Sequence, residues 1–148
     1  MKKSNSRSAF TMIELVFVIV VIGILASIAM PRLWVTRDDA IIAKGRSDVS
    51  TIRSSIATDR QKRMLEGNTT IRAQLDSAAV NTDNEALFSD MLQYPIYAKD
   101  APGHWKKTGA NTYVYITGDG TNVTFTYNTA TGAFDCTHTN NACRQLTQ

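Results

Sequence analysis

One apolar segment, residues 10–30, constrains the fold of this chain more than any other feature of the sequence. It is 21 residues long, contains one charged side chain, Glu14, and follows nine residues that include Lys2, Lys3 and Arg7. A helix of that length extends roughly 30 Å, about the thickness of a bilayer core. A carboxylate inside such a helix costs roughly 2.5–3.5 kcal/mol to insert, so Glu14 is expected to have a specific role.

The residues around this segment predict its processing and its orientation. A secretory signal has a small-residue cleavage site after its apolar core. Here the small residue Ala9 precedes the core, and residues 26–29, Ala-Ser-Ile-Ala, offer only a weak site near its end. We therefore expect the helix to stay on the mature protein, with ordinary signal-peptide removal as the alternative. Because basic residues stay cytoplasmic, the rest of the chain is expected to be exported.

The charge balance argues against a basic nucleic-acid-binding domain. The chain has 16 basic and 13 acidic residues, and residues 1–9 contribute three basic residues and no acid. Without them 13 basic residues face 13 acids, so the positive excess lies entirely in the first nine residues. A domain that binds nucleic acid through its overall charge would keep that excess, whereas a local basic patch stays open.

The start of the apolar segment resembles a known processing site. It reads Ala9-Phe10-Thr11-Met12-Ile13-Glu14-Leu15 behind the basic leader. This run is similar to the corresponding site of type IV pilins and of the related pseudopilins of type II secretion and DNA-uptake systems. The resemblance covers about residues 7–33 and departs from the family at Ala9, where most members have Gly. It implies that a prepilin peptidase cuts between Ala9 and Phe10 and methylates the new amine, and that Glu14 is needed for filament assembly.

Glu14 also has a physical reason to act in assembly. Cleavage would leave the amine of Phe10 as a cation near the membrane face. The Glu14 carboxylate of a neighbouring helix, shifted by about one turn, would neutralise that amine, and two charges that are costly alone are tolerated together. The pair would then set the register of each new subunit. The alternative is a contact within one chain, because Phe10 and Glu14 are one helical turn apart.

The apolar pattern continues beyond residue 30 as one long helix, expected over residues 11–65 and ended by Glu-Gly-Asn at residues 66–68. We expect a kink near Pro31, which cannot donate a backbone hydrogen bond, with added freedom at Gly23. The resemblance implies the same for both residues. Three arginines seven residues apart border the apolar stripe. They are expected to face solvent, with subunit contacts or anionic lipid as the alternative: Arg46, Arg53 and Arg60.

The predicted fold is α+β and pilin-like: a long, kinked, membrane-spanning N-terminal helix packed on a C-terminal antiparallel β-meander. Four parts are expected, namely a leader, a membrane or filament-core helix, its amphipathic continuation and a β head, at residues 1–9, 10–30, 31–66 and 67–148. Period-two patterns separated by turn-rich connections predict the strands of the meander at residues 105–108, 112–117, 123–128 and 133–137.

Two details of the head are also expected from the pattern. In the second strand, Val114 and Ile116 are expected to pack against the helix, with Tyr113 and Tyr115 on the other face. Before the strands, residues 68–84 are expected to form a loop with a short helix near residues 71–75, and residues 85–92 a further short helix.

Cys136 and Cys143 are the only cysteines in the chain. In an exported head they are expected to form a disulfide that stabilises the fold by roughly 2–3 kcal/mol. Many type IV pilins likewise carry a C-terminal disulfide loop, which the family uses for surface contacts. The alternatives are free thiols or a metal pair, for which only His138 is near enough to assist zinc.

Two further motifs have a structural and a functional interpretation. Asp119 lies in Gly-Asp-Gly-Thr-Asn, where a tight turn is expected rather than a calcium site, because one acid is few ligands for that cation. Trp105, Lys106 and Lys107 suggest either a core anchor with exterior lysines or a surface patch that stacks on single-stranded DNA. No set of catalytic residues or cofactor fingerprint is recognised, so we expect no enzyme activity, no cofactor and no metal.

The expected function is that of a structural subunit of a type IV pilus-like filament serving adhesion or motility, protein secretion or DNA uptake. The expected partners are other copies, other pilins or pseudopilins, the prepilin peptidase, an inner-membrane assembly platform and membrane lipid. The protein is expected to cross the bacterial inner membrane once, with its head in the periplasm, and to leave the membrane on assembly. The alternatives are a DNA-binding minor subunit of a competence system and a membrane-anchored periplasmic domain that never polymerises.

Overall fold

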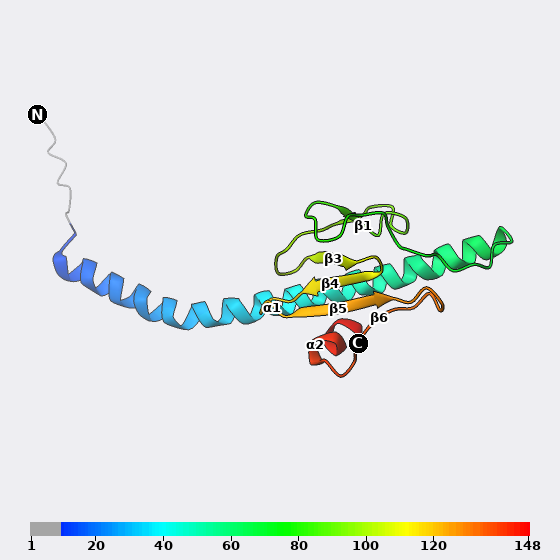
Figure 1. Cartoon of the computed structure of the whole chain (residues 1–148). Coiled ribbons are helices and arrows are strands. Elements are labelled where there is room, and N and C mark those ends of the chain that lie inside the picture. Colours follow the sequence, from blue (N-terminus) through cyan, green and yellow to red (C-terminus); the bar gives the residue numbers. More distant parts are fainter. Residues whose placement is uncertain (1–9) are drawn as a thin grey trace, which may run out of the picture. The chain divides into compact units, whose positions relative to one another are not determined.

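The computed structural model describes residues 10–148, except for the side chains of residues 29–36. The chain divides into two units, one ending at Thr36 and one spanning Arg37–Gln148, which we call the head. One helix, α1 (Met12–Leu65), contributes to both units (Figure 1). The leader with Ala9 lies outside the described residues. Gly23 and Pro31 both fall within α1, and the kink expected near them stays a prediction.

Both ends of α1 are set by local hydrogen bonds. At the start, the Glu14 amide donates to the hydroxyl and the carbonyl of Thr11, at 3.3 and 3.1 Å, so Thr11 caps the helix. At the end, Gly67 has a φ of 81°, and the Asn68 amide donates to the Arg63 carbonyl at 2.8 Å. Helices commonly end in this way, with a glycine in the left-handed conformation just after the last turn. The end expected at residues 66–68 is therefore confirmed.

The head contains the expected antiparallel meander. Its four strands follow one another in the order β3-β4-β5-β6, and every neighbouring pair is antiparallel. Their bounds are β3 (Trp105–Gly109), β4 (Thr112–Ile116), β5 (Asn122–Tyr127) and β6 (Phe134–Cys136). Figure 1 shows this sheet lying along the part of α1 that belongs to the head. A separate two-stranded sheet pairs β1 (Ala86–Leu87) with β2 (Ile96–Tyr97).

The two short helices expected before the sheet are absent from residues 71–75 and 85–92, which the structure describes as loop, turn and strand. In the second of these segments, the amide of Phe88 donates to the buried Asp76 carboxylate at 2.8 Å, and Phe88 has a φ of 56°. A positive φ lies outside the right-handed helical region, so Phe88 cannot be part of a helix. Leu75, in the first segment, is fully buried, and a helix that short is too costly to nucleate without tertiary support.

The core lies between the head portion of α1 and one face of the sheet. Tyr113 and Tyr115 belong to this core and are fully buried, whereas Val114 and Ile116 are buried outside it, so the expected orientation of β4 is wrong. Gly45 of α1 provides the space, since a Cβ there would lie 2.6 Å from the Tyr115 ring. The Tyr115 hydroxyl donates to the Ile41 carbonyl at 2.7 Å, which satisfies its polar end inside the core.

The three arginines that border the apolar stripe hold the C-terminal part of the head against α1. Each of them donates to a backbone carbonyl, at Gln145, Phe134 and Thr131 respectively, over distances of 2.8–3.2 Å: Arg46, Arg53 and Arg60. Arg46 and Arg60 are exposed, as expected, and Arg53 is half-buried, but the sequence did not indicate their contacts with carbonyls of the head. Because they are spaced seven residues apart, about two helical turns, the three side chains lie on the same side of α1. Their carbonyl partners all belong to the last third of the chain.

Candidate functional site

The described N-terminal segment of α1 exposes an almost continuous apolar surface. Every large hydrophobic side chain from Phe10 to Ile28 is exposed, with accessible fractions between 37% for Val21 and 83% for Met12. The apolar residues occupy all sides of the helix rather than one stripe. A helix that is hydrophobic all round is stable only when another apolar phase or protein surface covers it.

Phe10 and Glu14 lie at the start of this surface. Phe10 is 81% exposed, and the Glu14 side chain makes no hydrogen bond or ion pair with any described residue. Only the Glu14 backbone is engaged, in the cap with Thr11. Thr11 and Glu14 have the spacing of a capping box, in which the Thr11 hydroxyl accepts from the Glu14 amide.

Within the part of the chain that the structure describes, no helix satisfies the length and hydropathy expected of a membrane span.

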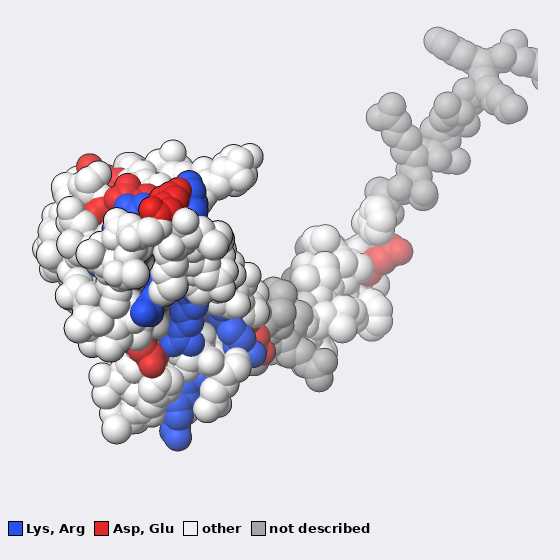
Figure 2. Space-filling model, turned by 90° about the vertical axis from the view of Figure 1, so that its right-hand side faces the viewer, with Lys and Arg blue, Asp and Glu red and all other residues white. Residues whose placement is uncertain are grey.

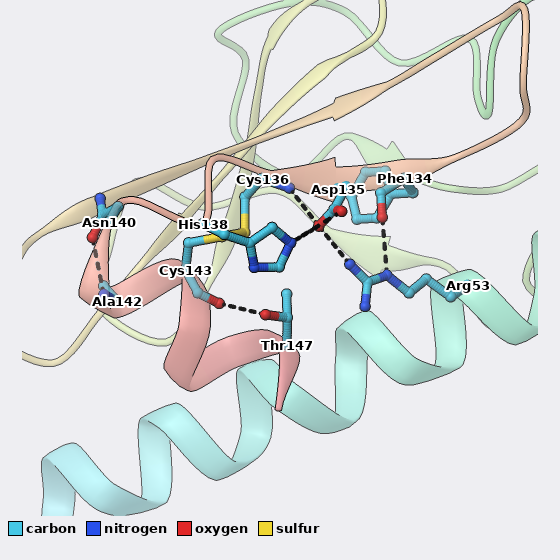
Figure 3. The surroundings of a disulfide bond; sticks show 9 residues. All are labelled: Arg53, Phe134, Asp135, Cys136, His138, Asn140, Ala142, Cys143 and Thr147. Atoms are coloured by element: carbon cyan, nitrogen blue, oxygen red, sulfur yellow. Dashed lines mark hydrogen bonds and ion pairs between the residues drawn. A yellow bond between two sulfur atoms is a disulfide. The ribbon is translucent and has the colours of Figure 1, made fainter.

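The expected disulfide is confirmed between Cys136, at the end of β6, and Cys143 in the short helix α2 (Asn141–Thr147) (Figure 3). The sequence pattern did not indicate α2. Its start is capped by the Asn140 side chain, which accepts a hydrogen bond from the Ala142 amide at 2.9 Å. Cys143 and Leu146 are fully buried, so α2 is fixed by the bond on one side and by core packing on the other.

Asp135 joins this region to α1. Its carboxylate accepts hydrogen bonds from Arg53 at 2.7 Å and from the Cys136 amide at 2.8 Å, and it lies 3.1 Å from the His138 ring (Figure 3). Partial burial raises the pKa of Asp135, but the hydrogen bonds from Cys136 and His138 and the charge of Arg53 outweigh it. The net effect holds the pKa of Asp135 below its usual range.

The residues considered as alternative metal ligands have other partners in the structure. Both cysteines are in the disulfide, which removes them as thiolates. Asp119 accepts hydrogen bonds from the amide and the hydroxyl of Thr121, at 3.0 and 2.9 Å, and so closes the turn between β4 and β5. These bonds, with the one from Thr117, lower the pKa of Asp119. Within residues 10–148, no group of three or more histidine, cysteine or acidic side chains is arranged to hold a metal ion.

The surface patch considered for DNA at Trp105, Lys106 and Lys107 is not present, because two of its three members are inside the head. Trp105 is fully buried, and Lys107 is 4% exposed. Lys107 donates to the Asp76 carboxylate at 2.6 Å, whereas Lys106 is bound at 2.6 Å to Asp100. The physical reason is the alternation along β3, which turns residues 105 and 107 to the core face together.

Comparison with known proteins gives one match. Residues 4–30 match the family model described as the prokaryotic N-terminal methylation motif. No curated protein and no solved structure shows significant similarity to the chain. The matched motif contains Ala9, Phe10, Glu14 and Gly23 and ends one residue before Pro31.

This motif marks proteins that are structural subunits rather than enzymes. It also implies anchoring in the inner membrane and a place in the periplasm or in a filament. The head adds an antiparallel sheet behind a long N-terminal helix, the pilin-like α+β layout expected from the sequence. Residues 4–30 thus carry the methylation motif that marks the type IV pilin and pseudopilin family, and the described residues have a pilin-like α+β layout.

Proposed function

We propose that this protein polymerises into a type IV pilus-like filament through the N-terminal part of α1, after cleavage between Ala9 and Phe10. The observation that carries the proposal is the exposed apolar surface between Phe10 and Ile28, with Glu14 at its start, whose carboxylate has no partner among the described residues. Before assembly, residues 10–30 would lie in the inner membrane with the head in the periplasm. In the filament, the same segments of other copies would cover the surface, and the heads would form the exterior.

Glu14 would set the register between neighbouring subunits. Processing frees the amine of Phe10, one helical turn from Glu14, and a charge buried among apolar helices is tolerated when it meets an opposite charge. The Glu14 side chain has no partner among the described residues, which supports a partner on another copy. The prepilin peptidase and an inner-membrane assembly platform would act on the subunit before it joins the filament.

Replacing Glu14 tests the proposal. We expect Glu14→Leu and Glu14→Gln to be cleaved and inserted normally but to lower the yield of sheared filaments at least about tenfold. A tenfold change corresponds to a loss of roughly 1.4 kcal/mol in the binding free energy of one subunit contact. Mass spectrometry of the mature protein shows whether it begins at Phe10, and electron microscopy counts filaments. Ser27→Leu, a polar-to-apolar change on the same helix, is the matched control. Wild-type filament yield from the Glu14→Leu protein would rule out this role.

The alternative of a membrane-anchored domain that never polymerises makes a different prediction. Cysteines introduced at Thr11 and Leu15 in separate copies should crosslink across the subunit contact if filaments form. If the wild-type head is exported and folded but neither crosslinks nor filaments appear, the protein is a monomeric anchor and the filament proposal fails.

A further inference from the structure

A small pocket in the head is lined by three arginines and a buried tyrosine. Arg60 and Arg63 come from the last turns of α1, Arg72 from the segment after it, and Tyr127 from the end of β5. We call it the guanidinium pocket. Gly132, in the turn between β5 and β6, lies at its edge. Figure 2, which looks toward the end of the head where α1 stops, shows lysine and arginine side chains gathered near the middle of that face.

Tyr127 offers the pocket a hydroxyl donor that no described residue of the head uses. It is only 3% exposed, yet its hydroxyl makes no hydrogen bond with any described residue. Among the described residues only the side-chain oxygen of Asn111 is both buried and unpartnered, so the Tyr127 hydroxyl reaches the surface of the pocket and can donate to a group that enters it. Burial raises the pKa of Tyr127, with Asp59 adding to the effect and the three guanidiniums opposing it. The hydroxyl therefore remains a donor at neutral pH.

The arginines likewise have donors to spare. Arg60 uses one bond, to the Thr131 carbonyl at 3.2 Å, and Arg63 uses one, to the Thr70 hydroxyl at 3.0 Å. Each guanidinium has five N–H donors. Among the described residues, neither of these two arginines has a carboxylate within 4 Å.

The acids near the pocket are engaged by Arg72. Asp59 accepts two hydrogen bonds from Arg72, at 2.9 and 3.1 Å, and Asp90 lies 4.0 Å from the same guanidinium. What remains free around the pocket is a hydroxyl donor and two positive charges. Those groups suit a carboxylate, whose two oxygens accept several charge-assisted hydrogen bonds.

The opposite end of the head carries the complementary charge. Asp38, Asp39 and Asp119 line a hollow beside the β4–β5 turn. Asp39 is exposed and makes no ion pair or hydrogen bond with any described residue. Asp39 and Arg60 are 21 residues apart on α1, which is roughly 32 Å along the helix. In Figure 1 the β4–β5 and β5–β6 turns lie at opposite ends of the sheet.

We infer that the guanidinium pocket of one copy of this chain binds the Asp39 carboxylate of a second copy displaced along the helix axis. This inference rests on the proposed filament, in which copies are stacked with their helices aligned. It adds a contact between heads to the contact between N-terminal helices. The guanidinium pocket and Asp39 lie on the same molecule, so a single kind of contact, repeated between copies, would engage both in every subunit.

Charge reversal in the full-length protein tests the inference. We expect Arg63→Glu and Asp39→Arg each to lower filament yield at least about tenfold, because attraction becomes repulsion at a partly desolvated contact. The double variant restores the pair in the opposite sense and should recover most of the yield. Lys62→Glu is the matched control, because it makes the same change of charge one residue away from Arg63. Lys62 is exposed and does not line the pocket. This variant should assemble as the wild type does.

A variant without a change of charge separates loss of the contact from loss of the fold. Tyr127→Phe removes only a hydroxyl that has no partner in the described head, so its unfolding midpoint should match the wild type while filament yield falls several-fold. Disulfide formation in each variant checks that the head has folded. Wild-type yield from Arg63→Glu, or no recovery in the double variant, overturns the inference. If the wild-type protein itself forms no filaments, the proposed function fails instead.

Titration with inorganic phosphate separates a subunit contact from a free-anion site. If the pocket receives a carboxylate of another copy, millimolar phosphate should compete with assembly of the wild-type protein. In the Arg63→Glu/Asp39→Arg double variant, phosphate should lower filament yield no more than chloride does at the same ionic strength. Phosphate binding that leaves assembly unchanged would show that the pocket serves a soluble anion, and the inference would be wrong.

Discussion

The buried carboxylate of Asp76 is the most sensitive single group in the head. It has no exposed surface, and it accepts hydrogen bonds from the Lys107 ammonium at 2.6 Å, the Tyr113 hydroxyl at 2.8 Å, the Phe88 amide at 2.8 Å and the Ala78 amide at 3.1 Å. It therefore ties the irregular segment after α1 to strands β3 and β4. We predict that Asp76→Ala removes a large share of the free energy of unfolding of the head.

The magnitude follows from what the substitution leaves behind. Removing one partner of a buried ion pair costs about 3–5 kcal/mol, because the other charge stays buried. Here that charge is Lys107, which keeps only the Ala78 carbonyl at 2.9 Å. The head has 112 residues, from 37 to 148, for which a total stability of roughly 6–17 kcal/mol is typical. The loss is thus a large share of the whole.

Urea unfolding of the full-length protein in detergent measures this loss. Tryptophan fluorescence reports on the core through Trp105 if the other tryptophan is replaced, as Trp34→Phe. A loss of 3–5 kcal/mol should lower the midpoint by roughly 2–3 M at a slope near 1.5 kcal/mol per M. Asp100→Ala is the control, because that carboxylate is 59% exposed in its pair with Lys106 and should cost less than about 1 kcal/mol.

Two results would refute this reasoning. The first is a loss below about 1 kcal/mol for Asp76→Ala, which would mean that the pair contributes little. The second is additivity with Lys107→Met. Since the methionine removes the stranded charge, the double variant should be no less stable than Asp76→Ala alone.

Three further predictions concern the packing and charge of the head. Gly45→Ala places a Cβ 2.6 Å from the Tyr115 ring and should cost about 1–3 kcal/mol by overpacking, seen as a lower urea midpoint. Replacing both Cys136 and Cys143 by serine opens the C-terminal loop and should cost about 2–3 kcal/mol, which reduction of the wild type should reproduce. Asp135, whose pKa is lowered in the folded head, stabilises it fully above its unfolded pKa near 3.8 and loses that contribution as pH falls through the lower folded value. Asp135→Asn should therefore flatten the acid limb of a stability–pH curve.

The regular elements of this protein could be predicted because their signals are local. The apolar period of α1, its Gly67 stop and the alternation along β5 each depend on residues within a few positions of one another. The disulfide could be expected because the chain has two cysteines and the leader indicates export. The errors came from contacts over long sequence distances. Phe88 is drawn out of a helical conformation by Asp76, twelve residues earlier.

The roles of the arginines and of β4 show the same limit. Arg46 reaches a carbonyl 99 residues away and Arg53 one that is 81 residues away, so no local pattern distinguishes them from solvated side chains. In β4, both faces carry large apolar groups, and hydrophobicity alone cannot choose between tyrosines and aliphatic residues. The choice depends on the space at Gly45, which lies on another element.

The sequence by itself determined the helix, its ends, the strand order and the processing motif, because hydrogen bonding and apolar periodicity within a few residues suffice for each. Only the tertiary structure decided which face of the sheet meets α1, which lysine is buried, and that Arg60, Arg63 and Arg72 surround Tyr127. Those outcomes depend on where distant segments of the chain meet, and the free energy of burying a group depends on all of the neighbours it acquires there.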